Sequence, residues 1–187
     1  MLIAAGTEVD YTVTYLEMTK RPSYPHPHLP ANQIATLLRA VSPPAWYFLS
    51  LYDAVGRDYA WEAAHQKPEE ETQAWLDDEG VELYTLISQG WPQGFFIYDL
   101  TEAGTCELAL FGLVPQAIGK GLGSFLLRTA ILDAWDKPDV EKLSVNTCTL
   151  DHPRALQNYQ KHGFVPVRRE NHKRVLRRDR DLARIPD

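Results

Sequence analysis

The sequence predicts an α+β fold in which a mixed, mostly antiparallel central sheet is flanked by helices. Short runs rich in β-branched and aromatic residues alternate apolar and polar positions, as strands do. Two segments in the second half have the i, i+3, i+4 apolar spacing of helices packed on a sheet. A glycine-rich turn, Gly119–Gly123, joins a strand-like run to the first of these helices. With 187 residues and no internal repeat, we expect a single domain over residues 1–187.

The N-terminal half is divided by strand propensity and by the residues that interrupt it. Val9–Met18 is the first expected strand, and its alternation places Val9, Tyr11, Val13 and Tyr15 on one face. Asn32–Ala40 is predicted to be a short helix that stops before two prolines. Ala45–Tyr52 is strongly apolar, which fits a second strand or another buried segment. An acidic helix is expected over Glu69–Leu76, directly after a proline.

The middle of the chain is predicted to form three strands of antiparallel type. Val81–Ser88 and Gly94–Leu100 are β-rich runs that a short turn joins into a hairpin. A turn at Gly104 then leads into Cys106–Leu113, the strand before the glycine-rich turn.

The C-terminal part is predicted to alternate helices with strands. Leu122–Trp135 has the apolar spacing of a helix, and Val140–Thr149 alternates as a strand does. Asp151 is the expected N-cap of a further helix, which Gly163 closes as a C-cap. Phe164–Arg168 then begins another strand.

Composition excludes several classes of function. The net charge of −6 argues against general nucleic-acid binding, which requires a basic surface. The basic run Arg168–Arg180 is therefore expected to be a polar strand or a solvated tail. No apolar run approaches the roughly 20 residues of a membrane span, so no membrane partner is expected. The N-terminus lacks the basic segment of a secretion signal, and we expect a cytoplasmic location.

The two cysteines and two of the histidines are weak candidates for sites. Cys106 and Cys148 both lie in expected strands, where a disulfide would fit, although buried thiols of a reducing compartment fit better. His26 and His28 stand two residues apart in a proline-broken loop without a third ligand nearby. We therefore expect exposed histidines there, and no metal site.

The turn from Val114 to Gly123, VPQAIGKGLG, is the strongest candidate for a binding site. At a strand-to-helix junction its backbone N–H groups lie where the helix dipole is most positive, which suits a phosphate or pyrophosphate. Glycine permits positive φ angles and close approach of the ligand. The spacing Gly119, Gly121, Gly123 fits neither the dinucleotide fingerprint nor the ATP-type loop. A tight turn without a ligand fits the same residues.

Two segments together resemble the GNAT superfamily of acyl-CoA-dependent N-acyltransferases. ELALFGLVPQAIGKGLGSFLL, residues 107–127, is similar to the family's acetyl-CoA pyrophosphate motif. DHPRALQNYQKHGF, residues 151–164, is similar to the family's Ala-x-x-x-Tyr-x-x-x-Gly-Phe helix. The resemblance implies a GNAT-like fold that transfers an acetyl group from acetyl-CoA to a primary amine of a small molecule or peptide by direct attack on the thioester. A catalytically inactive acyl-CoA-binding regulatory module is the alternative. Acetyl-CoA and an amine acceptor are the implied partners, and the protein would be a monomer or homodimer.

The resemblance also implies roles for individual residues. Tyr159 would be the general acid that protonates the leaving thiolate, and the backbone N–H of Leu113 would polarise the thioester carbonyl. This chain has Ile118 where the family usually has Arg or Gln, and His152 where an Asn is usual. The residues implied to bind acetyl-CoA are Leu113, Val114, Ile118, Gly119, Lys120, Gly121, Leu122, Gly123, Ser124, His152 and Ala155.

Glu107 is the candidate general base, because it interrupts an otherwise apolar strand. A buried carboxylate is costly unless it has a partner or a task, and it could act on the amine through a water. A carboxylate that faces solvent or pairs with a cation fits the same position. Asn146 and Thr147 are candidates for contact with the acceptor or thioester. Most of the tryptophans Trp46, Trp61, Trp75 and Trp91 are expected in the core or at interfaces, with one or two lining an aromatic acceptor pocket.

Overall fold

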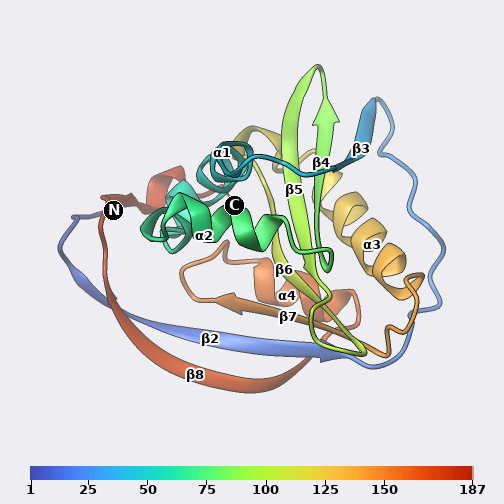
Figure 1. Ribbon diagram of the computed structural model, residues 1–187. Helices are drawn as coiled ribbons and strands as arrows, with labels where there is room; N and C mark the ends of the chain where they lie inside the picture. Colours follow the sequence, from blue (N-terminus) through green and yellow to red (C-terminus); the bar gives the residue numbers. More distant parts are fainter. Residues whose placement is uncertain (187) are drawn as a thin grey trace.

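The computed structural model describes residues 1–186 (Figure 1). Its centre is a seven-stranded sheet with strand order β3-β4-β5-β6-β7-β2-β8. Only β6 and β7 pair in parallel among the neighbouring strands of this sheet. The predicted α+β fold with a mixed, mostly antiparallel sheet is therefore confirmed. The strands are β2 (Glu8–Met18), β3 (Ala35–Ala40), β4 (Val81–Ser88), β5 (Trp91–Asp99), β6 (Thr105–Leu113), β7 (Lys142–Cys148) and β8 (Val165–Val175), with a small separate pair of β1 (Leu2–Ile3) and β9 (Arg180–Asp181).

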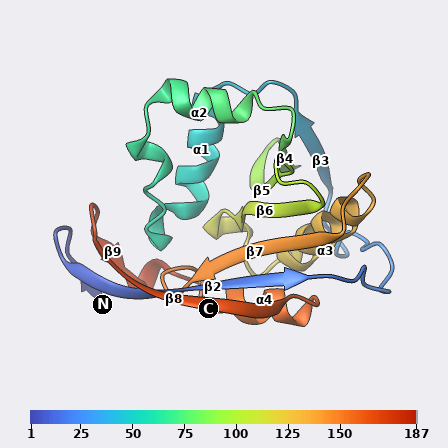
Figure 2. The ribbon, with the colours of Figure 1, turned by 60° about the horizontal axis from the view of Figure 1, so that its bottom comes forward.

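Helices cover both faces of the sheet. They are α1 (Ala45–Gly56), α2 (Glu69–Leu76), α3 (Leu122–Trp135) and α4 (Ala155–Lys161). Figure 2 shows α1 and α2 on one side of the sheet and α4 on the other. Alternate residues of β5 link the layers. Phe95 packs edge-on against Trp61, which follows α1, whereas Tyr98 donates its hydroxyl hydrogen to the Ala130 oxygen of α3 on the opposite face.

The parallel pair β6 and β7 is joined over a short distance only. Its ladder runs from Thr105 opposite Lys142 to Glu107 opposite Ser144, and the two strands do not pair beyond that point. β6 nevertheless continues to Leu113 against β5, and β7 continues to Cys148 against β2. The two strands therefore diverge inside a continuous sheet, which leaves a gap between them.

The N-terminal strand occupies an unexpected place. β2 lies between β7 and β8 and pairs with both, so it joins the N-terminus to the C-terminal half (Figure 1). Its existence was predicted correctly, but the most buried residues are Thr14, Leu16 and Met18. These lie on the face opposite Val9, Tyr11, Val13 and Tyr15, because packing against the core outweighs the apolar character of the alternate positions.

A substitution in β2 tests this placement. Leu16→Ala should lower the free energy of unfolding by about 2–5 kcal/mol, because Leu16 is fully buried between two paired strands. Leu38→Ala is the matched control, since Leu38 is half exposed on the edge strand β3 and should change stability by only about 0.5 kcal/mol. Urea denaturation measures both. Equal, small effects would contradict a central position for β2.

One prediction in the N-terminal half was wrong, and another was right in only one of its two alternatives. Asn32–Ala40 is not a helix: Ala35–Ala40 is the strand β3, and its pairing with β4 overrides local helix propensity. Ala45–Tyr52 is the other buried segment rather than the strand, and it forms most of α1. The helical signal lies in its buried residues Phe48, Leu51, Tyr52 and Val55, which follow the i, i+3, i+4, i+7 rhythm and extend past the predicted end.

The C-terminal elements follow the predictions more closely, with one correction. Both α2 and α3 have the predicted bounds, and Gly163 has the positive φ of 108° expected after a helix end. Asp151, however, is not the N-cap of α4, since Arg154 occupies that position. The Asp151 carboxylate instead accepts hydrogen bonds from the end of β7. It therefore satisfies donors of that strand rather than those of the helix.

The structure also shows where the cysteines, the basic run and the loop histidines lie. Both cysteines are free thiols, with Cys106 buried and Cys148 half-buried. Most of the basic run forms β8, a largely exposed polar strand, as predicted. His26 is exposed, and its Nε2 atom lies 3.8 Å from Oδ2 of Asp136. Within residues 1–186, no cluster of three or more His, Cys, Asp or Glu is placed to hold a metal ion, and no helix is long and apolar enough to cross a bilayer.

Candidate active site

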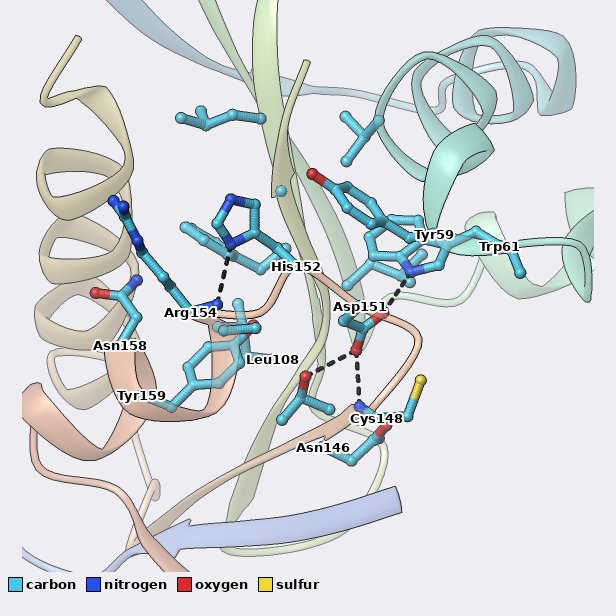
Figure 3. Close-up of a pocket in the computed structure, with 18 of the residues that line it drawn as sticks. Tyr59, Trp61, Leu108, Asn146, Cys148, Asp151, His152, Arg154, Asn158 and Tyr159 are labelled. Carbon is cyan, nitrogen blue, oxygen red and sulfur yellow. Dashed lines mark hydrogen bonds between the residues drawn. The ribbon is translucent and has the colours of Figure 1, made fainter. Parts of the chain in front are cut away.

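A cavity of about 650 Å³ opens where β6 and β7 diverge (Figure 3). One wall consists of β6 residues from Leu108 to Leu113, and β7 contributes its last three residues, Asn146–Cys148. The remaining walls come from opposite faces of the sheet: α1 with the segment after it, and α4 with the segment before it. Chains that are far apart in the sequence therefore meet at one gap.

The glycine-rich turn lies at one end of this cavity. Ile118 and Gly123 line the cavity, and Gly121 is the N-cap of α3. Gly119 and Gly121 have φ angles of 81° and 79°, which L side chains rarely adopt, so glycine is needed at both. α3 has no side-chain cap and no acidic residue in its first turn. Its first backbone N–H groups are thus left for an anionic ligand.

The backbone N–H of Leu113 points into the gap. Val114 donates its N–H to the Gln93 oxygen at 3.0 Å, and Gly94 lies opposite Leu113. Because N–H groups alternate between the two sides of an antiparallel strand, the Leu113 N–H points away from β5. On that side the ladder with β7 has already ended, at Glu107. Leu113 therefore offers a donor to the cavity, whereas the Val114 N–H is already engaged.

Tyr159 reaches the cavity from α4, opposite the α1 side. Its ring packs edge-on against Phe111 and Phe164, and its side chain is 7% exposed. Burial, and to a smaller extent the Asp151 carboxylate, raise the pKa of Tyr159 above its ordinary value. The hydroxyl therefore stays protonated at neutral pH.

His152 precedes α4 and also lines the cavity, as Ala155 does. The Nδ1 atom of His152 accepts the backbone N–H of Arg154 at 3.1 Å. In the neutral ring this places the proton on Nε2.

Glu107 lies at the point where β6 and β7 separate. Asn146 donates its Nδ2 hydrogen to Glu107 Oε1 at 3.4 Å, and Asn146 and Thr147 line the cavity whereas Glu107 does not. Burial, followed by the negative charge of Asp99, raises the pKa of the Glu107 carboxyl. Glu107 thus borders the cavity through Asn146 and holds a proton more tightly than an exposed glutamate.

The other implied binding residues lie at or beside the turn. Val114 and Leu122 are buried in the core, so they contribute position and backbone rather than a side chain. Lys120 is exposed, and Ser124 Oγ lies 3.3 Å from His162 Nε2. The structure thus brings Leu113, Ile118, Gly123, His152, Ala155 and Tyr159 to one cavity, whereas Val114, Gly119, Lys120, Gly121, Leu122 and Ser124 do not line it.

Sequence reasoning missed most of the wall on the α1 side. Tyr52, Tyr59 and Glu62 line the cavity, together with Asp151, which accepts hydrogen bonds from Trp61 Nε1, Thr147 Oγ1 and the Cys148 N–H at 2.7–2.9 Å. Of this wall, the sequence points only to Trp61, as one of several tryptophans. The one available signal was the aromatic density between Tyr52 and Trp61, and it does not reveal which rings face a cavity.

Several solved structures share this fold at low sequence identity. A functionally unknown conserved protein from Staphylococcus epidermidis has a TM-score of 0.62 and 13% identity, covering 91% of this chain and 63% of that one. GCN5-related N-acetyltransferases from Kribbella flavida and Sphaerobacter thermophilus have TM-scores of 0.58 and 0.60 at 16% and 15% identity. The matched regions cover 87% and 89% of this chain but only 56% and 52% of those two proteins. The chain thus spans less than two thirds of each.

No curated protein matches the chain over its sequence. The sequence model of the acetyltransferase (GNAT) family, by contrast, matches residues 48–164, well over half of the chain. This range runs from α1 to the residue after Gly163, and it includes the glycine-rich turn, the diverging strands and Tyr159. The fold, the gap between β6 and β7 and this match lead to one conclusion. The chain belongs to the acetyltransferase (GNAT) family.

Proposed function

We propose that this protein is an N-acetyltransferase that moves an acetyl group from acetyl-CoA to a primary amine of a small molecule or peptide. The observation that carries the proposal is the continuity of one cavity of about 650 Å³. It runs from the glycine-rich turn at the N-terminus of α3, past the Leu113 N–H, to the Tyr159 side chain. Anion binding, carbonyl polarisation and proton donation are thereby available along a single path.

In this proposal the turn binds the pyrophosphate of acetyl-CoA through backbone groups. The N–H groups from Gly119 to Gly123 and the dipole of α3 provide the attraction. Ile118 supplies an apolar contact where a basic side chain would add charge, so binding depends on the backbone. The pantetheine arm would then lie between β6 and α4, beside His152 and Ala155.

The chemistry consists of one bond formed and one broken. Acetyl-CoA supplies an activated acyl group as a thioester. The amine nitrogen attacks the carbonyl carbon while the Leu113 N–H stabilises the oxygen, and the C–S bond then breaks. The amine loses a proton through a water to the carboxylate of Glu107, which Asn146 orients by donating a hydrogen bond to it, and the thiolate gains a proton from the Tyr159 hydroxyl.

Glu107→Gln should lower kcat by about a hundredfold and change the pH dependence of stability. The folded state raises the Glu107 pKa, so the carboxyl contributes its full stability below the unfolded-state pKa and loses it as pH rises through the folded-state value. Glutamine never ionises. As the pH rises from about 4 to about 8, the variant should therefore gain thermal stability relative to wild type. Thermal unfolding of both proteins at the two pH values measures the difference in Tm between variant and wild type. If that difference were the same at both pH values, it would contradict a Glu107 carboxylate that burial destabilises.

A thiol-release assay with acetyl-CoA and a panel of amines tests the proposed function. Thiol release that depends on an amine, with an acetylated amine detected by mass spectrometry, is the expected result. Tight acetyl-CoA binding without turnover on any amine would instead favour the inactive acyl-CoA-binding regulatory module. If acetyl-CoA neither bound nor reacted, both readings would fail.

A further inference from the structure

We propose that the cavity wall formed by Tyr52, Tyr59 and Trp61 is the acceptor subsite, and that it takes a primary amine carried by a flat, apolar group. The Tyr59 hydroxyl is the hydrogen-bond partner of the amine nitrogen. This inference rests on the proposed function and names its substrate class. The wall lies on the α1 side, opposite the α4 side along which the pantetheine arm would run.

The rings of this wall offer a broad apolar surface. Tyr52 and Trp61 have centroids 5.3 Å apart at 37°, and Tyr59 meets the His152 ring edge-on at 6.1 Å. Trp61 is fixed from behind by Phe95, which is fully buried. Rings held in this way present flat faces at low entropic cost, and such faces suit an aromatic or otherwise flat group.

The carboxylates of the wall are already engaged. Glu62 pairs with Arg174 at 3.3 Å and accepts the backbone N–H of Arg177 at 3.2 Å. Asp151 accepts hydrogen bonds from Trp61, Thr147 and the Cys148 N–H, and the buried Arg180 interacts with its charge. An acceptor with several positive charges would lose its hydration here without gaining an unshared anion.

Tyr59 carries the polar group of the wall that remains for a ligand. The backbone of Ala63 and Ala64 lies close to the Tyr52 hydroxyl and moderates the rise in its pKa that burial causes, and Trp61 Nε1 donates to Asp151. The Tyr59 side chain is 6% exposed and lines the cavity, and its hydroxyl has no partner among residues 1–186. In Figure 3 this hydroxyl points away from Asp151, toward the space beside the His152 ring.

A buried hydroxyl without a partner destabilises the fold, so its presence points to a ligand that completes it. Burial raises the pKa of Tyr59 to about 12, so the group remains a neutral phenol at physiological pH. Its oxygen can then accept an N–H of the amine, which keeps the nitrogen lone pair free to attack the thioester.

The test compares wild type with Tyr59→Phe and Tyr47→Phe, using phenethylamine and spermidine as probes. Tyr47 is the matched control, because its hydroxyl donates to Thr85 Oγ1 at 2.9 Å and it does not line the cavity. Calorimetry with CoA present measures amine binding without turnover, and the thiol-release assay gives kcat/KM. Phenethylamine should bind and react better than spermidine. Tyr59→Phe should weaken phenethylamine binding and lower its kcat/KM by about tenfold to a hundredfold, with unchanged acetyl-CoA affinity.

Stability separates this role from a structural one. Tyr59→Phe removes an unpaired hydroxyl and should leave Tm unchanged or raise it, whereas Tyr47→Phe removes a hydrogen bond and should lower Tm. Preference for spermidine, or unchanged phenethylamine binding by Tyr59→Phe, would overturn the inference while leaving acetyl transfer intact. Failure of acetyl-CoA to bind would overturn the proposed function, and Tyr59-dependent binding of phenethylamine would still support the subsite.

Discussion

Gly119→Glu should abolish acetyl-CoA binding under conditions where wild type binds it. The substitution places a carboxylate beside the N–H groups at the start of α3, where the pyrophosphate is proposed to lie. Repulsion across a few ångströms at a protein surface amounts to about 3 kcal/mol, which is about a hundredfold in Kd. No atom lies within 4 Å of a Cβ at this position, so the side chain can be accommodated without a clash. Calorimetric titration with acetyl-CoA measures the loss.

The control for this prediction is Gly6→Glu. Gly6 has a φ of 85° and equally open space around a Cβ, so the backbone strain and the added charge match those at Gly119. It lies in the N-terminal turn before β2, away from the cavity. Gly6→Glu should lose a similar amount of stability and keep its acetyl-CoA affinity. Equal affinities for the two variants would contradict pyrophosphate binding at the glycine-rich turn.

Tyr159→Phe should lower kcat by about a hundredfold and leave acetyl-CoA affinity unchanged, because a general acid acts only after binding. The ring still packs against Phe111 and Phe164, so the fold should persist. Steady-state thiol release, with calorimetry on the same samples, separates kcat from affinity.

Tyr84→Phe is the matched control for Tyr159→Phe. The Tyr84 hydroxyl donates to Glu82 at 2.9 Å, and Tyr84 is not among the residues that line the cavity. This variant should lose some stability but keep its kcat. If Tyr159→Phe kept the wild-type kcat, the thiolate would leave without that hydroxyl, and the assignment of the acid would be wrong.

Local features of this chain could be predicted from the sequence. The bounds of α3, the positive φ angles at Gly119 and Gly121 and the helix end at Gly163 all depend on residues close together in the chain. Glycine at a positive φ and apolar spacing along a helix are decided by sterics within a few residues. The side of the site proposed to bind acetyl-CoA is therefore visible in the sequence.

The rest of the fold and site depends on contacts between distant residues. The insertion of β2 between β7 and β8 joins residues such as Tyr15 and Asn146, which no local pattern specifies. The acceptor wall is held by the hydrogen bond from Trp61 to Asp151, which are 90 residues apart. Ala35–Ala40 became a strand because β4 offered it an edge. Propensity alone does not report such partners.

Titration of acetyl-CoA into the wild-type chain, with ATP and NAD titrated in parallel, tests the central claim most directly. A site built from the glycine-rich turn and the gap between β6 and β7 predicts micromolar affinity for acetyl-CoA and CoA, and much weaker binding of the other two nucleotides. ATP or NAD binding as tight as that of CoA would instead make the turn a general phosphate site. No binding of any of them would leave this cavity without the ligand proposed for it.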